Sequence, residues 1–80
     1  MTDSKFYKEM VKQLHDRECS IRQLAMLCGV SYLTFIHFFN PNYPFKPVSS
    51  KTKFRIHNHL GISYDVMDEY NEMILKERGA

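Results

Sequence analysis

Apolar residues recur at intervals of three and four along most of this 80-residue chain, which is the spacing of one face of an α-helix. No segment alternates apolar and polar residues over the length of a strand, so no strand is expected. The sequence therefore predicts an all-α fold, a single compact domain over residues 1–80. The predicted helices cover about 4–18, 21–28, 32–39, 50–59 and 64–78.

Short polar residues and glycines mark the predicted helix ends. Ser20 and Gln23 have the spacing of a capping box, in which each side chain bonds the backbone amide of the other. Gly29 stands where the second helix needs a left-handed residue to end, and Ser31 caps the third helix. All three prolines fall in residues 40–48, which are therefore predicted to form a loop.

Residues 20–40 have the dimensions of a helix-turn-helix, two short helices joined by a tight turn that contains glycine. Ala25 must be small because the two helices cross closely there, and Gly29 must adopt a positive φ in the turn. The inward-pointing residues expected to hold this pair on the body of the domain are Leu24, Cys28, Val30, Phe35 and Phe38.

This stretch resembles the helix-turn-helix of the lambda-repressor-like family, also called the XRE or Cro-like family. The small, glycine, apolar, cap, polar and apolar positions of that motif are occupied by Ala25, Gly29, Val30, Ser31, Thr34 and Phe35. Further on, Lys51-Thr52 and residues 59–63 (HLGIS) resemble the family's fourth helix and its ending. The resemblance covers residues 5–67 and implies a five-helix DNA-binding domain. Two features depart from it: Ile21 replaces a common phosphate-binding Gln, and loop 40–48 is unusually long and rich in proline.

The resemblance implies that the third helix lies in the major groove of double-stranded DNA, with its first turns at the base edges. The side chains then expected to face the bases are Tyr32, Leu33, Ile36 and His37. Those expected near phosphates are Arg22, Ser31, Thr34, Asn40, Lys46 and Lys51. Apolar groups can contact thymine methyl groups, so we expect modest discrimination that leans towards A·T. The alternative is that Ile36 is buried and only the other three residues are presented.

The distribution of charge favours an anionic partner at one end of the protein. Residues 5–55 hold nine Lys or Arg and three acids, whereas residues 56–80 hold two basic and five acidic residues. No acid lies between Glu18 and Asp65. A basic front and an acidic tail suit a protein that touches an anion with one end, although a short chain can also reach such a division by chance.

The last predicted helix carries a wide apolar stripe that extends beyond the part that four helices would cover. An uncovered apolar end favours a partner surface, and members of the family commonly dimerise, so a homodimer on a palindromic site is expected. The residues expected at its interface are Tyr64, Tyr70, Ile74 and Leu75. The alternative is that this helix packs on the first helix of its own chain.

Other chemistry has little support in the sequence. His57 and His59 stand two residues apart and point to different sides of a helix, and no nucleophile–base pattern is present, so no metal, cofactor or enzymatic activity is expected. Two cysteines are too few for the disulfide framework of a small secreted domain. Residues 23–45 carry no charged residue but are interrupted by polar residues and proline, so a cytoplasmic protein without a membrane span is expected.

Two functions are compatible with these features. The first is a sequence-specific transcriptional regulator that binds double-stranded DNA, of the type of small phage or plasmid repressors. The second is a protein-interaction module on the same fold, such as an antirepressor that binds a repressor. The apolar residues within 32–36 and the low net charge of +2 favour the second.

Overall fold

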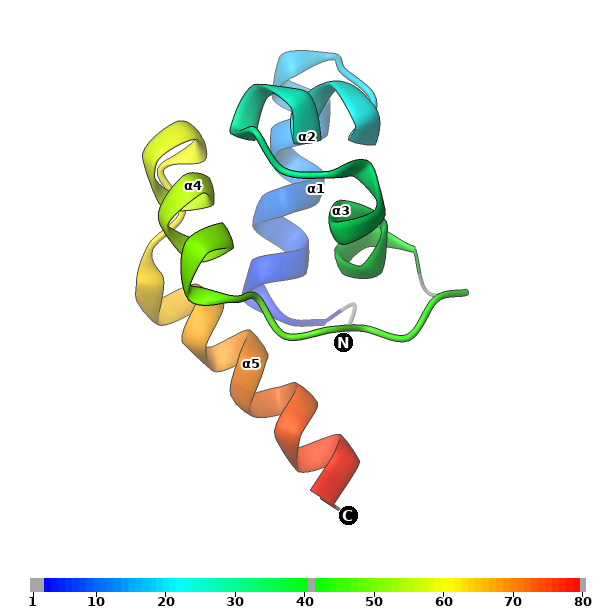
Figure 1. Cartoon of the computed structure of the whole chain (residues 1–80), viewed down its shortest axis with the longest axis vertical. Coiled ribbons are helices and arrows are strands. Elements are labelled where there is room, and N and C mark those ends of the chain that lie inside the picture. Colours follow the sequence, from blue (N-terminus) through cyan, green and yellow to red (C-terminus); the bar gives the residue numbers. More distant parts are fainter. Residues whose placement is uncertain (1–2, 41, 80) are drawn as a thin grey trace.

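Helices account for most of the part of the chain that the computed structural model describes, residues 3–40 and 42–79 (Figure 1). In these residues there are five helices and no strand: α1 (Lys5–Arg17), α2 (Ile21–Cys28), α3 (Tyr32–Phe39), α4 (Ser50–Leu60) and α5 (Tyr64–Gly79). The all-α prediction is confirmed, and each predicted boundary lies within one residue of the observed one. Within the same ranges, no helix combines the length and the apolar character needed to cross a membrane.

Local capping explains where these helices begin and end. A serine side chain accepts a hydrogen bond from a first-turn amide at the start of each of the first four helices, and at α2 the full capping box is present. Gly29 and Gly61 end α2 and α4 in the left-handed conformation, with φ of 69° and 72°. Glu18 ends α1 with φ of 50°, a conformation that non-glycine residues adopt less readily.

The core lies where α1, α3 and α5 meet, and aromatic rings fill its centre. The ring centroids of Phe6 and Tyr70 are 4.7 Å apart, and those of Phe6 and Phe38 are 5.5 Å apart. All three side chains are buried, and burying a large apolar side chain contributes about 1.5–3 kcal/mol. With a Cα radius of gyration of 11.7 Å, the chain has the size of a compact domain of its length.

Two of the residues expected at a dimer interface belong to this core. Tyr70 is fully buried and Ile74 is 2% exposed, so neither can contact a second copy without unfolding α5. The prediction was wrong for both residues because α5 packs along α1, which covers the apolar stripe within the chain. Tyr64 and Leu75, the other two predicted interface residues, are exposed.

Arg55 and Asn71 make polar contacts that join α4 and its preceding loop to the rest of the domain. Arg55 Nη1 donates to the Gly29 carbonyl oxygen at 3.2 Å, which ties α4 to the turn between α2 and α3. Asn71 of α5 bonds both backbone groups of Val48, with distances of 2.7 Å to the nitrogen and 3.0 Å to the oxygen. As a result, α4 begins at a fixed place opposite α3.

Candidate nucleic-acid interface

Helix α3 is buried over a wide sector and exposed over the remainder. Its buried residues are Phe35, Ile36, Phe38 and Phe39. At 100° per residue, these four span about 160° of the helix circumference. Ile36, at the edge of that sector, is only 9% exposed. The expectation that Ile36 faces bases was therefore wrong, because the buried sector is wider than a single stripe.

The other three candidate base-reading residues remain on the surface of α3. Leu33 is 70% exposed, and Tyr32 and His37 are partly exposed. The guanidinium carbon of Arg22 lies 4.2 Å from the centroid of the Tyr32 ring, a cation–π arrangement. This contact brings the first turn of α2 beside the first turn of α3, so a basic group stands next to the exposed side of α3.

The proline-rich loop folds back on the C-terminal half of α3. His37 Nδ1 lies 2.8 Å from the Pro44 carbonyl oxygen. The rings of His37 and Tyr43 meet edge to face, with centroids 5.7 Å apart. Asn40, expected near phosphate, accepts a hydrogen bond from the Asn42 amide at its Oδ1, at 2.9 Å. That oxygen is therefore used in the turn, because short polar side chains before a loop readily bond the backbone two residues on.

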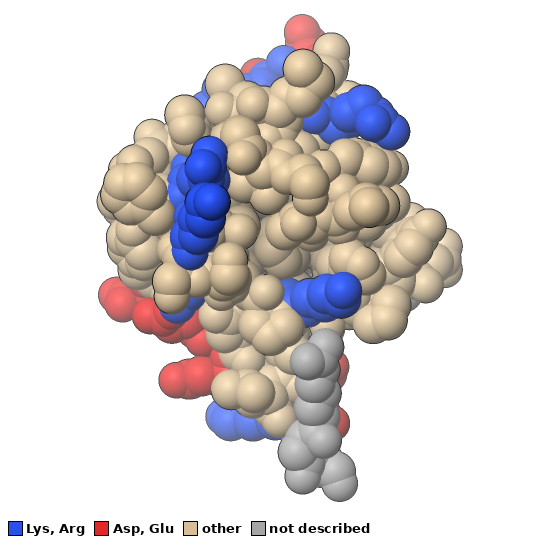
Figure 2. All heavy atoms as spheres, in the orientation of Figure 1, with Lys and Arg blue, Asp and Glu red and all other residues tan. Residues whose placement is uncertain are grey.

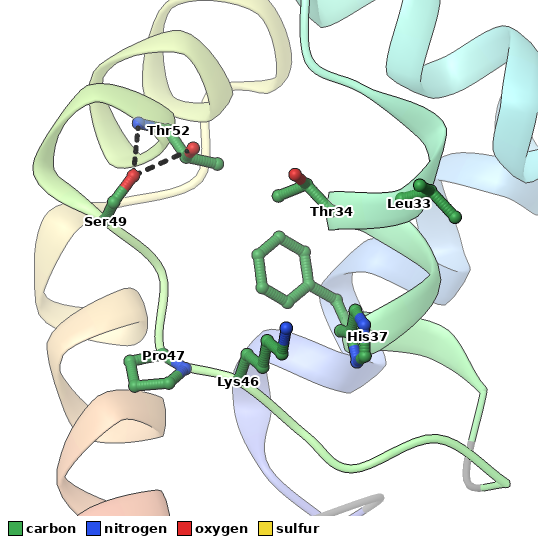
Figure 3. Close-up of a pocket in the computed structure, with 8 residues that line it drawn as sticks. Leu33, Thr34, His37, Lys46, Pro47, Ser49 and Thr52 are labelled. Atoms are coloured by element: carbon green, nitrogen blue, oxygen red, sulfur yellow. Dashed lines mark hydrogen bonds between the residues drawn. The ribbon is translucent and has the colours of Figure 1, made fainter.

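A cavity of about 320 Å³ separates α3 from the start of α4 (Figure 3). Its lining comes from α3, the loop and α4: Leu33, Thr34, His37, Phe38, Lys46, Pro47, Ser49 and Thr52. Figure 3 shows the Lys46 amine reaching into the space between α3 and α4, and Thr34 lying across from Ser49 and Thr52. The cavity therefore joins candidate base-reading and phosphate-binding residues on one face.

Hydroxyl groups on this face already have hydrogen-bond partners within the chain. Ser31 Oγ accepts from the Thr34 amide at 3.2 Å and shares a 2.8 Å hydrogen bond with Thr34 Oγ1. Ser49 Oγ accepts from the Thr52 amide at 3.3 Å and donates to Thr52 Oγ1 at 3.0 Å. These bonds fix the starts of α3 and α4, so the hydroxyl groups are positioned before any ligand arrives.

Basic side chains surround the exposed side of α3. Arg22, Lys46 and Lys51 are exposed and come from α2, the loop and the first turn of α4. Figure 2 shows Lys and Arg groups spaced over this view of the molecule, with acidic groups at its margins, several of them beside α5. Lys53 lies towards that acidic side and pairs with Asp68 of α5 at 2.8 Å. The face is therefore suited to an anionic ligand.

Sequence reasoning missed two residues that hold this face in shape, namely Asn71 and Arg55. Asn71 follows a core residue of α5 and is itself half-buried. The only sign of its role in the sequence is that a polar residue stands beside the apolar stripe of this helix. The partners of Asn71 and Arg55 are backbone groups distant in sequence, which no local pattern identifies.

No metal site is found in the ranges that the structure describes, since no three His, Cys, Asp or Glu side chains gather there as ligands. Comparison with known proteins gives no match: no protein-family model, no curated protein and no solved structure matches the chain. The resemblance to lambda-repressor-like proteins therefore rests on the motif residues of the sequence.

Proposed function

We propose that this protein is a sequence-specific transcriptional regulator that binds double-stranded DNA as a lambda-repressor-like domain. In this proposal α2 and α3 form the helix-turn-helix, and α3 enters the major groove. The observation that carries the proposal is that exposed basic residues of α2 and the loop flank α3: Arg22 packs on Tyr32, and Lys46 lines the cavity beside α3. Lys51, also exposed, lies in the first turn of α4 next to Thr52, which lines the same cavity.

The arrangement suits protein–DNA interfaces, in which some residues position the protein on phosphates and others recognise bases. Contacts to phosphates from both sides of the groove orient a protein, and side chains at the groove floor distinguish bases. Arg22 stands beside the first turn of α3, Lys46 lines the cavity between α3 and α4, and Lys51 belongs to the first turn of α4. Tyr32, Leu33 and His37 lie between these groups and are the proposed base-reading residues.

The proposal includes two copies on a palindromic site, because a two-fold dimer places two recognition helices one turn of DNA apart. Tyr70 and Ile74 are excluded from the contact between copies by their burial. Leu75 and Tyr64, 63% and 40% exposed on α5, are the candidates that remain. We expect such a regulator to act in the cytoplasm.

Selection from a random pool of DNA duplexes tests this function. The proposal expects an enriched palindromic motif whose affinity falls steeply as salt is raised, because bound phosphates release counterions. Weak binding of all sequences without enrichment would contradict it.

A second candidate function is binding to another protein, such as a repressor, through the same face. Met26 and Leu33, 75% and 70% exposed on α2 and α3, favour it. An Arg22→Ala, Lys51→Ala double variant separates the two functions, because it lowers affinity for any DNA sequence if the first is correct. Retained partner binding by that variant, with no DNA binding by the parent protein, would favour the second.

A further inference from the structure

The hydrogen bond between His37 and the loop determines which ring nitrogen carries a proton. A carbonyl oxygen can only accept, so the Nδ1 that lies 2.8 Å from the Pro44 oxygen must be the donor. In the neutral imidazole, one nitrogen is protonated and the other is an acceptor. Neutral His37 therefore has an unprotonated Nε2.

The surroundings of the ring fix its orientation as well as its tautomer. The Tyr43 ring meets it edge to face at 81°, and the Pro44 carbonyl oxygen holds its Nδ1 edge at 2.8 Å. The two nitrogens of a five-membered ring point in diverging directions, so Nε2 points away from the loop. His37 also lines the cavity beside α3 together with Lys46, the charged side chain among the cavity residues.

We propose that His37 determines base specificity by accepting, at Nε2, a hydrogen bond from the exocyclic amino group of adenine or cytosine. In the major groove, adenine N6 and cytosine N4 are the donors, whereas the polar groups that guanine and thymine present there are acceptors. Since every base pair holds one amino-bearing base, an acceptor at Nε2 favours the orientation of the pair that brings the amino group to it and disfavours the reverse. This inference rests on the DNA-binding function proposed above.

Selection at pH 8, where an ordinary histidine is neutral, provides the first test. The parent protein is expected to select a motif, and His37→Ala is expected to lose the base-pair preference at one position of the half-site alone. His59→Ala is the matched control. His59 is exposed in the last turn of α4, away from the cavity at the start of that helix, so this variant should select an unchanged motif. A motif that is unchanged in His37→Ala would overturn the proposal.

A second test needs no protein variant and so does not depend on how His37→Ala folds. The amino-bearing base is replaced in a synthetic duplex by an analogue that lacks the amino group, such as purine for adenine. The loss of a single hydrogen bond of about 0.5–1.5 kcal/mol corresponds to about 2- to 10-fold weaker binding by the parent protein.

These results separate the two proposals. A selected motif whose affinity is unaffected by removing the amino group overturns the role of His37 but leaves DNA binding in place. A pool that gives no motif with the parent protein instead overturns the DNA-binding function itself.

Discussion

Asn71 of α5 bonds both polar backbone groups of Val48: its Oδ1 accepts from the Val48 amide, and its Nδ2 donates to the Val48 carbonyl oxygen. Val48 is buried and immediately precedes Ser49, the N-cap of α4. One side chain of the last helix therefore fixes the place where α4 starts, and with it the positions of Lys46 and Lys51 on the proposed DNA-binding face.

Replacing Asn71 with alanine is expected to destabilise the protein. The substitution leaves two backbone groups of a buried residue without partners, and each such group costs about 1–3 kcal/mol. Urea unfolding followed by circular dichroism measures the change. Asn58→Ala is the control, because Asn58 is exposed on α4 and should change the free energy of unfolding by no more than about 0.5 kcal/mol. Equal stability of the two variants would show that the Asn71 contact contributes nothing.

Gly29 and Gly61 offer a matched pair of left-handed glycines, with φ of 69° and 72°. A Cβ at Gly61 has no atom within 4 Å, whereas a Cβ at Gly29 stands 2.6 Å from Arg55 Nη1. Gly61→Ala is therefore expected to cost only the left-handed conformation, about 1–2 kcal/mol. Gly29→Ala should cost more, because the Arg55 side chain must also move away from the Gly29 carbonyl oxygen.

A double-mutant cycle isolates the cost of displacing the Arg55 side chain. In an Arg55→Ala background, the costs of Gly29→Ala and Gly61→Ala should become equal within about 0.5 kcal/mol. Thermal or urea unfolding of the variants gives the comparison. If the difference between the two glycines persists without Arg55, the displacement of Arg55 is not its cause.

Cys28 is expected to resist thiol reagents in the folded protein, whereas Cys19 should react. Burial raises the pKa of the Cys28 thiol from 9.0 to about 11, and the charge of Arg17 offsets this only in part. Because the thiolate is the reactive form, Cys28 remains protonated at pH 8. Iodoacetamide labelling of the Cys19→Ser and Cys28→Ala variants, followed by mass spectrometry, compares the reaction rates of the two cysteines. Equally rapid labelling of both cysteines would contradict it.

The same shift predicts how stability depends on pH. The pKa of Cys28 is higher in the folded protein than in the unfolded chain, so its contribution to stability is complete below about pH 9 and is lost as pH rises through 11. Unfolding measured across this range should show a shallower decline for Cys28→Ala than for the parent protein.

The helices could be predicted because their signals are local. Ser20 with Gln23, and Gly29 after α2, act within one turn of chain, and the structure has the predicted capping box and turn. The partners of apolar faces could not be predicted in this way. Periodicity placed Tyr70 and Ile36 on apolar faces, but only packing decides which neighbour covers them. The Asn71–Val48 contact spans 23 residues and joins a side chain to backbone, which leaves no trace in a sequence pattern.

The salt dependence of DNA binding is expected to identify the phosphate contacts. Arg22→Gln and Lys51→Gln should each reduce the slope of log affinity against log salt by about 1, and should weaken binding to all sequences alike. Lys76→Gln is the control, because Lys76 is exposed on α5, outside the proposed face. Titrations by fluorescence anisotropy over a range of salt provide the slopes. Identical slopes for the three variants would remove Arg22 and Lys51 from the interface.

Ile74 and Leu75 are neighbours on α5 with opposite exposures of 2% and 63%, so they separate folding from self-association. Ile74→Ala is expected to lower the free energy of unfolding by about 2–5 kcal/mol, as is typical of a buried aliphatic side chain. Leu75→Ser should change stability little but weaken binding of a second copy to a palindromic duplex. Sedimentation of the protein–DNA complex counts the copies bound. Unchanged two-copy binding by Leu75→Ser would exclude this part of α5 from the contact and direct the search to other surfaces.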